Sequence, residues 1–418
     1  MEKPVRFRLP LAGLLGLAVL AAGCGSSGEP AADGKVTISY AIWDKNDQPS
    51  AEKIIAAFQQ ANPAVTVKLE ITPWDQYWTK LQTAASGGAA PDVFWMNSLN
   101  VGMYAEGGII APLDESKAEG LPEAVVDGYR HDGKLYALPH NVSIPALWYD
   151  KKIFDAAGVK YPTADWTWDD VKAAAEKLTD PAKKQFGILA PMWDQGGFYN
   201  TMIQAGGHVL SPDRKKSGFD DPASIQGLEF WTGLIKDRVA PVAQVYTDTD
   251  PIQLFQSGKY GMYYGGVWFA STYWANPEIR ERIDVAPLPK GPAREAVILL
   301  GLANAVSAKS EHPQESAAFA EFVSSEPAQK ILSASGGGAL SARPGTQDGW
   351  FEAFPSWHLK ETYDASMPHG VPYPATLNTA QWQDVQNKLL AEAWAGRRPV
   401  ADVAKEIAAQ MNEILAKE

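Results

Sequence analysis

Tryptophans and short polar side chains at the ends of apolar runs are the residues of this sequence best suited to binding chemistry. The stretch Pro91–Asn97 (PDVFWMN) is one such run, and it ends in Trp95, Met96 and Asn97. Glycines and a proline before it favour a strand buried on both faces of a parallel sheet. Ligands of open α/β sheets bind outside the carboxyl ends of such strands. An indole beside an amide suits the C–H face and the hydroxyls of a sugar. The alternative is that Trp95 only closes the core.

Further tryptophans and polar residues follow similar runs. Fifteen tryptophans among 418 residues is a high number, and binding clefts use this large, rigid and amphipathic side chain. The expected stacking residues, besides Trp95, are Trp43, Trp193, Trp268 and Trp382, and the expected hydrogen-bonding residues are Asp44, Asn97, Asn141, Asp194 and Arg343. Each of the polar residues, taken alone, also fits a loop, a turn or a surface ion pair.

Other tryptophans have spacings that indicate structural roles. Trp148 lies inside a strand-like run, and Trp231 and Trp394 occur at helical spacing, so all three are expected in the core. Trp166 and Trp168 flank Thr167, a candidate helix cap, and are expected to staple that helix.

Signatures of enzymes are missing from the sequence. It contains no GxSxG, GxxxxGK[ST], HExxH or CxxC motif. A secreted glycoside hydrolase would need two carboxylates across a sugar site, and Asp44, Asp92 and Asp194 are the candidates, although their spacing does not require it. We therefore expect no catalytic residue, no cofactor and no metal ion.

Alternating segments predict how these residues are positioned. Strands are expected at residues 36–43, 65–71 and 92–96, with helices at 50–62 (capped by Ser50) and 73–85 between them. This β-α-β-α-β order is typical of an open α/β sheet. Further strands are expected at 146–149, 186–190, 261–268, 283–286 and 296–307, a hairpin at Asp132-Gly133, and helices at 151–157, after Thr167, and at 198–205, 222–237, 252–257, 313–322, 327–333, 379–395 and 400–416.

The amino-terminal segment has the layout of a secretory leader. Lys3, Arg6 and Arg8 precede an apolar run from Leu9 to Ala22, which is too short for a membrane-spanning helix. Cys24, the only cysteine, follows Ala-Ala-Gly, which resembles a bacterial lipobox. We expect a signal peptide at 1–23, lipidation at Cys24 and a flexible tether at 24–35. The alternative is an ordinary signal with an incidental free cysteine.

Net charge restricts the partners. The chain carries −12, and because the leader carries three basic residues against Glu2, the mature part carries −14. Such a charge argues against nucleic acid or an anionic membrane surface as a partner. A single cysteine excludes an internal disulfide, so stability must come from core burial.

The order of several short segments resembles a known family. GGIIAPLD, DGKLYALP, LWYDKKIFDAAGV, WTWDDVKAAAEKL, FQSGKYGMYYGGVW and GGGALSARPG occur in an order similar to that of the extracellular solute-binding proteins of bacterial ABC sugar importers. The resemblance covers residues 36–418. It implies a type II periplasmic-binding-protein fold, in which two α/β lobes are joined by a hinge and clamp a ligand in the cleft between them. The lobes would comprise 36–145 plus 300–338 and 146–299 plus 339–418.

The resemblance also carries site residues. Trp95, Trp268 (in GGVW) and Trp382 (in TAQWQDV) match stacking tryptophans of the maltose-binding members. An acid–base pair expected after Trp95 is replaced by Asn97, Ser98 and Leu99, and the glutamate expected near Ser143 is missing. These departures argue against maltose itself and leave the sugar class open.

The expected function is therefore that of a lipid-anchored, monomeric, extracytoplasmic binding component. It would capture a sugar or oligosaccharide by lobe closure and deliver it to membrane permease subunits with an associated ATPase. A binder of peptides or of phosphorylated small molecules is the alternative. A phosphate site would want clustered Arg or Lys near a helix N-terminus, and the tryptophan-bearing segments contain few.

Overall fold

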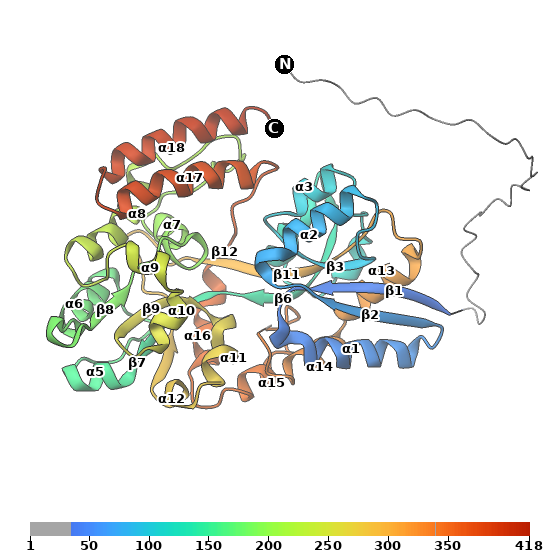
Figure 1. Ribbon diagram of the computed structural model, residues 1–418, viewed down its shortest axis with the longest axis horizontal. Helices are drawn as coiled ribbons and strands as arrows, with labels where there is room; N and C mark the ends of the chain where they lie inside the picture. The colour runs from blue at the N-terminus through green and yellow to red at the C-terminus, as the bar shows by residue number, and fades with distance from the viewer. Residues whose placement is uncertain (1–34, 339) are drawn as a thin grey trace, which may run out of the picture. The chain divides into compact units, whose positions relative to one another are not determined.

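The computed structural model describes residues 35–338 and 340–418. The predicted leader, Cys24 and nearly all of the predicted tether lie outside the described residues. Residues 36–418 form one compact unit, which contains two main β-sheets (Figure 1). No helix among the described residues is long and apolar enough to cross a membrane.

The first sheet confirms the predicted β-α-β-α-β opening. Its strand order is β12-β11-β3-β1-β2, and β6 pairs with β11. Strands β1, β2 and β3 are parallel to one another, whereas β11 runs antiparallel to β3, so the sheet is mixed and not purely parallel. The bounds are β1 (Val36–Ile42), β2 (Val65–Ile71), β3 (Val93–Asn97), β6 (Ala137–Ser143), β11 (Val297–Val306) and β12 (Gly370–Pro372).

Helices α1 and α13 pack against this sheet. The helices of this part are α1 (Gln48–Ala61), α2 (Trp74–Ser86), α3 (Val101–Glu106), α4 (Glu123–Val126), α13 (Pro313–Val323), α14 (Glu326–Ser333) and α15 (Asp348–Glu352). Ser50 does not cap α1, which begins two residues earlier. A proline in the first turn suits a helix start, and Ser50 is buried, with its hydroxyl donating to the carbonyl of Asp47 at 2.7 Å.

A small hairpin and a second sheet complete the strands. The hairpin joins β4 (Arg130–His131) to β5 (Lys134–Leu135), and positive φ at Asp132 and Gly133 confirms the predicted two-residue turn. The second sheet has the order β10-β7-β9-β8. Its bounds are β7 (Pro145–Asp150), β8 (Phe186–Leu189), β9 (Tyr260–Gly266) and β10 (Ile283–Ala286).

Most remaining helices surround the second sheet, and α17 and α18 form a carboxyl-terminal pair that packs on α8 (Figure 1). They are α5 (Lys151–Ala157), α6 (Trp168–Leu178), α7 (Tyr199–Gln204), α8 (Pro222–Lys236), α9 (Gln244–Asp248), α10 (Pro251–Gln256), α11 (Ala270–Trp274), α12 (Pro277–Arg280), α16 (Leu359–Ser366), α17 (Thr379–Trp394) and α18 (Val400–Leu415). The predicted cap of α6 is confirmed, because Thr167 and Asp170 form a reciprocal capping box.

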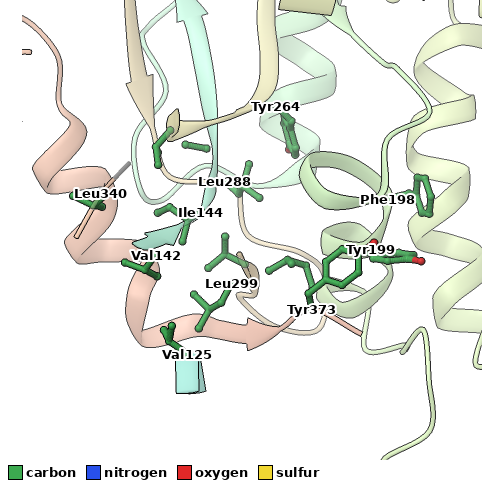
Figure 2. Packing of buried hydrophobic residues seen from close by; sticks show 14 of the residues in the cluster. Val125, Val142, Ile144, Phe198, Tyr199, Tyr264, Leu288, Leu299, Leu340 and Tyr373 are labelled. Atoms are coloured by element: carbon green, nitrogen blue, oxygen red, sulfur yellow. The ribbon is translucent and has the colours of Figure 1, made fainter. Parts of the chain in front are cut away.

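The chain passes between the two sheets from β6 to β7 and again from β10 to β11. Only Ile144 separates β6 from β7, and the first residues of β11 pair with β12 while its later residues pair with β3. Figure 2 shows buried side chains of these crossing segments, including Val142, Ile144 and Leu299, in one apolar cluster with Tyr199 and Tyr373. The crossing segments therefore share a continuous core.

Candidate functional site

A cavity of about 930 Å³ lies between residues of the first sheet and residues of the second. Its volume falls within the range of small-molecule sites. Seven of the residues expected from the sequence line it, namely Trp43, Asp44, Trp95, Asn97, Asn141, Trp193 and Trp268. They come from segments up to about two hundred residues apart in the chain and meet only in the folded unit.

Strand ends build the first wall. Trp43 directly follows β1, and Trp95 and Asn97 end β3, which runs parallel to β1. Parallel strands present their carboxyl ends at the same edge of a sheet, where ligands of α/β folds bind. The ring of Trp43 meets Trp95 edge-on at 5.0 Å and Trp74 at 5.1 Å. The wall is thus one connected group of aromatic rings.

Trp95 is the least accessible tryptophan of this wall. Only 2% of its surface is exposed. Its indole Nε1 donates to the Tyr40 hydroxyl at 2.7 Å, and that hydroxyl donates to Asn304 Oδ1 at 2.9 Å. Because the ring has so little free area, Trp95 supports the wall in this conformation more than it offers a face to a ligand. The sequence offered a cavity position and a core position for Trp95 as alternatives. In the structure Trp95 lies in the core and also borders the cavity.

The second wall consists of Trp193, Trp268 and Phe269 with Tyr263 behind them. Trp193 stacks on Phe269 at 6.0 Å with 24° between the rings, and it meets Trp268 edge-on at 6.0 Å. Among the described residues, no ring contact joins this group to the rings of the first wall. The two aromatic walls therefore face one cavity without touching.

Two glycines allow the indoles of the second wall to lie where they do. A Cβ on Gly196 would stand 2.1 Å from the Trp193 ring, and a Cβ on Gly266 would stand 2.2 Å from the Trp268 ring. Real Cβ atoms do not approach other heavy atoms so closely, so any side chain there would displace the indole. Gly196 lies in a π-helical turn, Asp194–Phe198, and such turns are frequent at functional sites.

Carboxylates and amides supply the polar groups of the cavity. Asp44 Oδ1 accepts from the Asn46 backbone N–H at 2.8 Å, and burial raises the pKa of the Asp44 carboxyl. Asn97 Oδ1 accepts from the backbone and side chain of Asn100 at 3.1 and 2.9 Å, whereas Asn141 Oδ1 accepts from the Ser143 hydroxyl at 3.4 Å. These bonds fix the orientation of each side chain.

Arg343 and Trp382, also expected at the site, are not among the residues that line the cavity. Arg343 donates from Nε to the Ser324 carbonyl at 3.2 Å and from Nη1 to the Glu119 carbonyl at 3.1 Å. Its guanidinium therefore joins the segment that contains Ser324 to the segment that contains Glu119. Trp382 has no exposed surface, and its Nε1 donates to Thr376 Oγ1 at 2.9 Å. A fully enclosed indole has no face to present to a ligand.

Asp194, a further hydrogen-bonding candidate, faces a buried network behind Trp193. Its carboxylate accepts from the Tyr373 hydroxyl and from Gln383 Nε2, the latter at 3.1 Å. Burial raises the pKa of the Asp194 carboxyl, and the bond from Tyr373 opposes that rise. Asp194 therefore holds the start of the π-helical turn against α17 and the segment after β12.

The carboxylate arrangement of a glycoside hydrolase is not formed by Asp44, Asp92 and Asp194. Of the three, only Asp44 lines the cavity. Asp92 precedes β3, at the opposite end of that strand from Asn97, where it accepts from Ser39 and from Ser310 Oγ at 2.6 Å. These three side chains thus do not face one substrate.

Sequence reasoning missed several residues of the cavity. Trp74 is 51% exposed and lines the first wall. It starts α2 just beyond the end of β2, so the strand-end argument used for Trp43 could have found it. Phe269, Tyr246 and Asp250 also line the cavity, and no local pattern singles them out. Trp394, expected in the core, is 2% exposed and also reaches the cavity wall.

Comparison with known proteins identifies the architecture. The diacetylchitobiose binding protein of Streptomyces coelicolor is 27% identical over 97% of this chain and 98% of its own. The maltotriose-binding protein of Pyrococcus abyssi is 28% identical over 59% of this chain and 53% of its own. An ABC substrate-binding protein of Listeria monocytogenes, solved in complex with cycloalternan, superposes with a TM-score of 0.83 at 27% identity, covering 91% of this chain and 99% of that one.

The fold and the cavity define a two-lobed α/β binding protein of the type II class, as the sequence predicted. Residues 43–330 match the model of the bacterial extracellular solute-binding protein family. The chain belongs to that family, whose named relatives are binding proteins and not enzymes.

Proposed function

We propose that this protein captures a sugar or a short oligosaccharide between its lobes and delivers it to the permease of an ABC importer. The observation that carries the proposal is the cavity with aromatic rings on both sides and fixed polar groups between them. Rings on two sides can cover both faces of a pyranose, and amides and carboxylates suit its hydroxyls. Relatives that bind diacetylchitobiose, maltotriose and cycloalternan support the same class of ligand.

The alternative of a phosphorylated ligand finds less support. A phosphate site requires Lys, Arg or a helix N-terminus directed at the anion. Among the described residues that line the cavity there is no Lys, Arg or His.

A thermal-shift screen tests the proposal. A ligand that binds only the folded form raises its melting temperature. We expect one or more compounds in a panel of mono- and oligosaccharides to stabilise the protein. Peptides and sugar phosphates serve as the comparison set, and stabilisation by these alone would contradict sugar capture.

The positions of the two sheets along the chain support a division into lobes. We assign 36–145 plus 300–338 to the first lobe and 146–299 plus 339–418 to the second. Most strands of the first sheet come from the first lobe, although β12 lies within 339–418, and the second sheet begins with β7 at the boundary residue Pro145. β11 starts at Val297 and continues across the proposed boundary, which suits a hinge strand.

Lipidation at Cys24 would hold the protein at the outer side of the cell membrane. We expect the anchored protein to be a monomer. The proposal is supported by the position of the only cysteine directly after a leader-like apolar run. Cys24→Ser should move the protein from the membrane fraction to the soluble fraction of cells, with wild type as the control. A variant that stays in the membrane fraction would show that the anchor lies elsewhere. Light scattering on the purified mature chain should give the molar mass of a single chain if the protein is a monomer.

A further inference from the structure

Two carboxylates on the cavity lining have no cationic side chain beside them among the described lining residues. The carboxylates of Asp44 and Asp250 line the cavity, and the described lining residues include no Lys, Arg or His. Lys45 follows Asp44 in the chain but is exposed and does not line the cavity. The described chain thus places only acidic charge on the lining.

Asp44 and Asp250 share a local geometry on opposite walls. Each precedes a helical segment, and each uses Oδ1 to accept from a backbone N–H two residues later, at 2.8 Å for Asp44 and 2.7 Å for Asp250. Among the described residues no hydrogen bond is formed by the second oxygen, Oδ2, of either side chain. The capping bonds fix both carboxylates while leaving one oxygen of each for a ligand.

Closure of the lobes would make these charges costly. Carboxylates that leave water lose favourable hydration, and a nearby opposite charge or hydrogen-bond donors must offset that loss. A neutral sugar offers hydroxyl donors but no charge. A sugar with a protonated amino group offers both, and an acidic sugar adds a further negative charge, which is unfavourable.

We propose that this site selects sugars that carry a protonated amino group and rejects acidic sugars such as uronic acids and sugar phosphates. The inference rests on the proposed capture of sugars and specifies the class of sugar. Asp44 on the first lobe and Asp250 on the second would contact the ammonium group, or two ammonium groups of one oligosaccharide, when the lobes close. The net charge of the mature part, −14, would also attract a cationic sugar from a distance.

Matched saccharides that differ in one substituent test the inference. We would titrate the full mature chain calorimetrically with cellotriose and with the β-1,4-linked trimer of glucosamine, and then with glucose, glucosamine and glucuronate. Mildly acidic buffer keeps the amine protonated. We expect the amino compound to bind at least about tenfold more tightly than its neutral counterpart, an advantage that shrinks as salt screens the charges, and we expect no binding of glucuronate.

Variants connect the preference to the two carboxylates. Asp44→Asn and Asp250→Asn retain the helix caps, because Asn caps as well as Asp, and each should reduce the preference for the amino compound by about fivefold or more. Asp248→Asn serves as the matched control. Asp248 is an exposed carboxylate on α9 that does not line the cavity, so its variant should keep the preference of wild type.

The outcomes separate the inference from the function on which it rests. If a neutral sugar, from these compounds or from the thermal-shift panel, binds as tightly as its amino counterpart, or if glucuronate binds, the charge selection is wrong while sugar capture stands. Equal loss of preference in Asp248→Asn would also overturn the assignment to Asp44 and Asp250. If no saccharide binds at all, sugar capture is wrong and the inference falls with it.

Discussion

Tryptophans of this protein divide into those that face the cavity with free ring area and those that are enclosed. Trp268 and Trp193 are half-buried on the second wall, whereas Trp382 is fully enclosed and Trp95 nearly so. A residue can therefore occupy a similar place in the sequence pattern and still have a different role, because tertiary packing decides which rings are covered.

Trp268→Ala and Trp382→Ala are expected to have opposite effects. A well-packed aromatic contact with a ligand contributes ~2 kcal/mol or more, roughly thirtyfold in affinity, so Trp268→Ala should weaken sugar binding by at least about tenfold with a small change in melting. Trp382→Ala should lower the free energy of unfolding by ~3–5 kcal/mol and leave the affinity of the folded protein near wild type. Calorimetric titration and thermal melts measure the two effects.

Trp95→Ala tests the earlier alternatives for this ring. With 2% of its surface exposed and its Nε1 bonded to Tyr40, we expect a loss of stability close to that of Trp382→Ala. Loss of affinity without loss of stability would instead show that Trp95 is a ligand platform in the closed form.

Asp194 should make stability depend on pH. Its pKa in the folded protein is raised by burial, so the folded form binds this proton more tightly than the unfolded form does. The contribution of Asp194 is therefore most favourable at low pH, and it declines as the pH rises through the raised pKa. Asp194→Asn removes this dependence, so the stability of wild type relative to the variant should fall from acidic pH toward neutrality.

Chemical denaturation of wild type and Asp194→Asn across that pH range measures whether the difference in their free energies of unfolding falls as the pH rises. Tyr373→Phe provides a second test, since the Tyr373 hydroxyl donates to the Asp194 carboxylate and lowers its pKa. Without that donor the decline should move to higher pH. A stability difference that rises with pH, or a decline unmoved by Tyr373→Phe, would contradict the role given to this carboxylate.

At the scale of elements, strand ends and the turns after them set the site. β1 and β3 end on the first wall, and β9 ends at Gly266, two residues before Trp268. The backbone of Gly266 has φ −69° and ψ 145°, which any residue can adopt. The need for glycine there comes from the Trp268 ring and not from the backbone.

Gly266→Ala should therefore displace the Trp268 indole and leave the strand in place. We expect the affinity for sugar to fall by about tenfold, approaching that of Trp268→Ala, with no further loss when both changes are combined. Gly233→Ala in α8 is the matched control, because a Cβ there meets no atom within 4 Å. Additive effects of Gly266→Ala and Trp268→Ala would indicate that the glycine acts through something other than this ring.

At the scale of the whole molecule, the two facing aromatic walls imply a change of shape on binding. Because their rings do not touch among the described residues, a ligand that contacts both walls gains more when the lobes approach, which shifts the population toward the closed form. The chain can bend at few places between the two lobes, namely at Ile144 between β6 and β7 and along β11. We expect the closing motion to occur at these segments.

Small-angle scattering should detect this closure. With a saturating sugar identified by thermal shift, the radius of gyration should decrease, and a sugar that gives no thermal shift should leave it unchanged. An unchanged radius with a bound ligand would mean that the site is formed in a rigid unit.

Much of the architecture follows from the sequence. Alternation in Val65–Ile71, the apolar run of Val93–Asn97 and the Thr167–Asp170 cap are local patterns, and the structure contains the strand or helix that each predicts. Local patterns determine elements because burial on one face and the capping of free N–H groups depend on neighbours in the chain. The strand-end argument also located Trp43 and Trp95 on one cavity.

Tertiary structure alone decided which candidates share the site and how much of each ring is free. Trp382 and Trp268 both matched a stacking pattern, yet the first lies on the buried face of α17, while Gly266 leaves room for the second. The antiparallel place of β11 beside β3 and the presence of both Asp44 and Asp250 on one cavity depend on contacts between segments about two hundred residues apart. No local pattern encodes such contacts, because they arise only when separate segments are packed against one another.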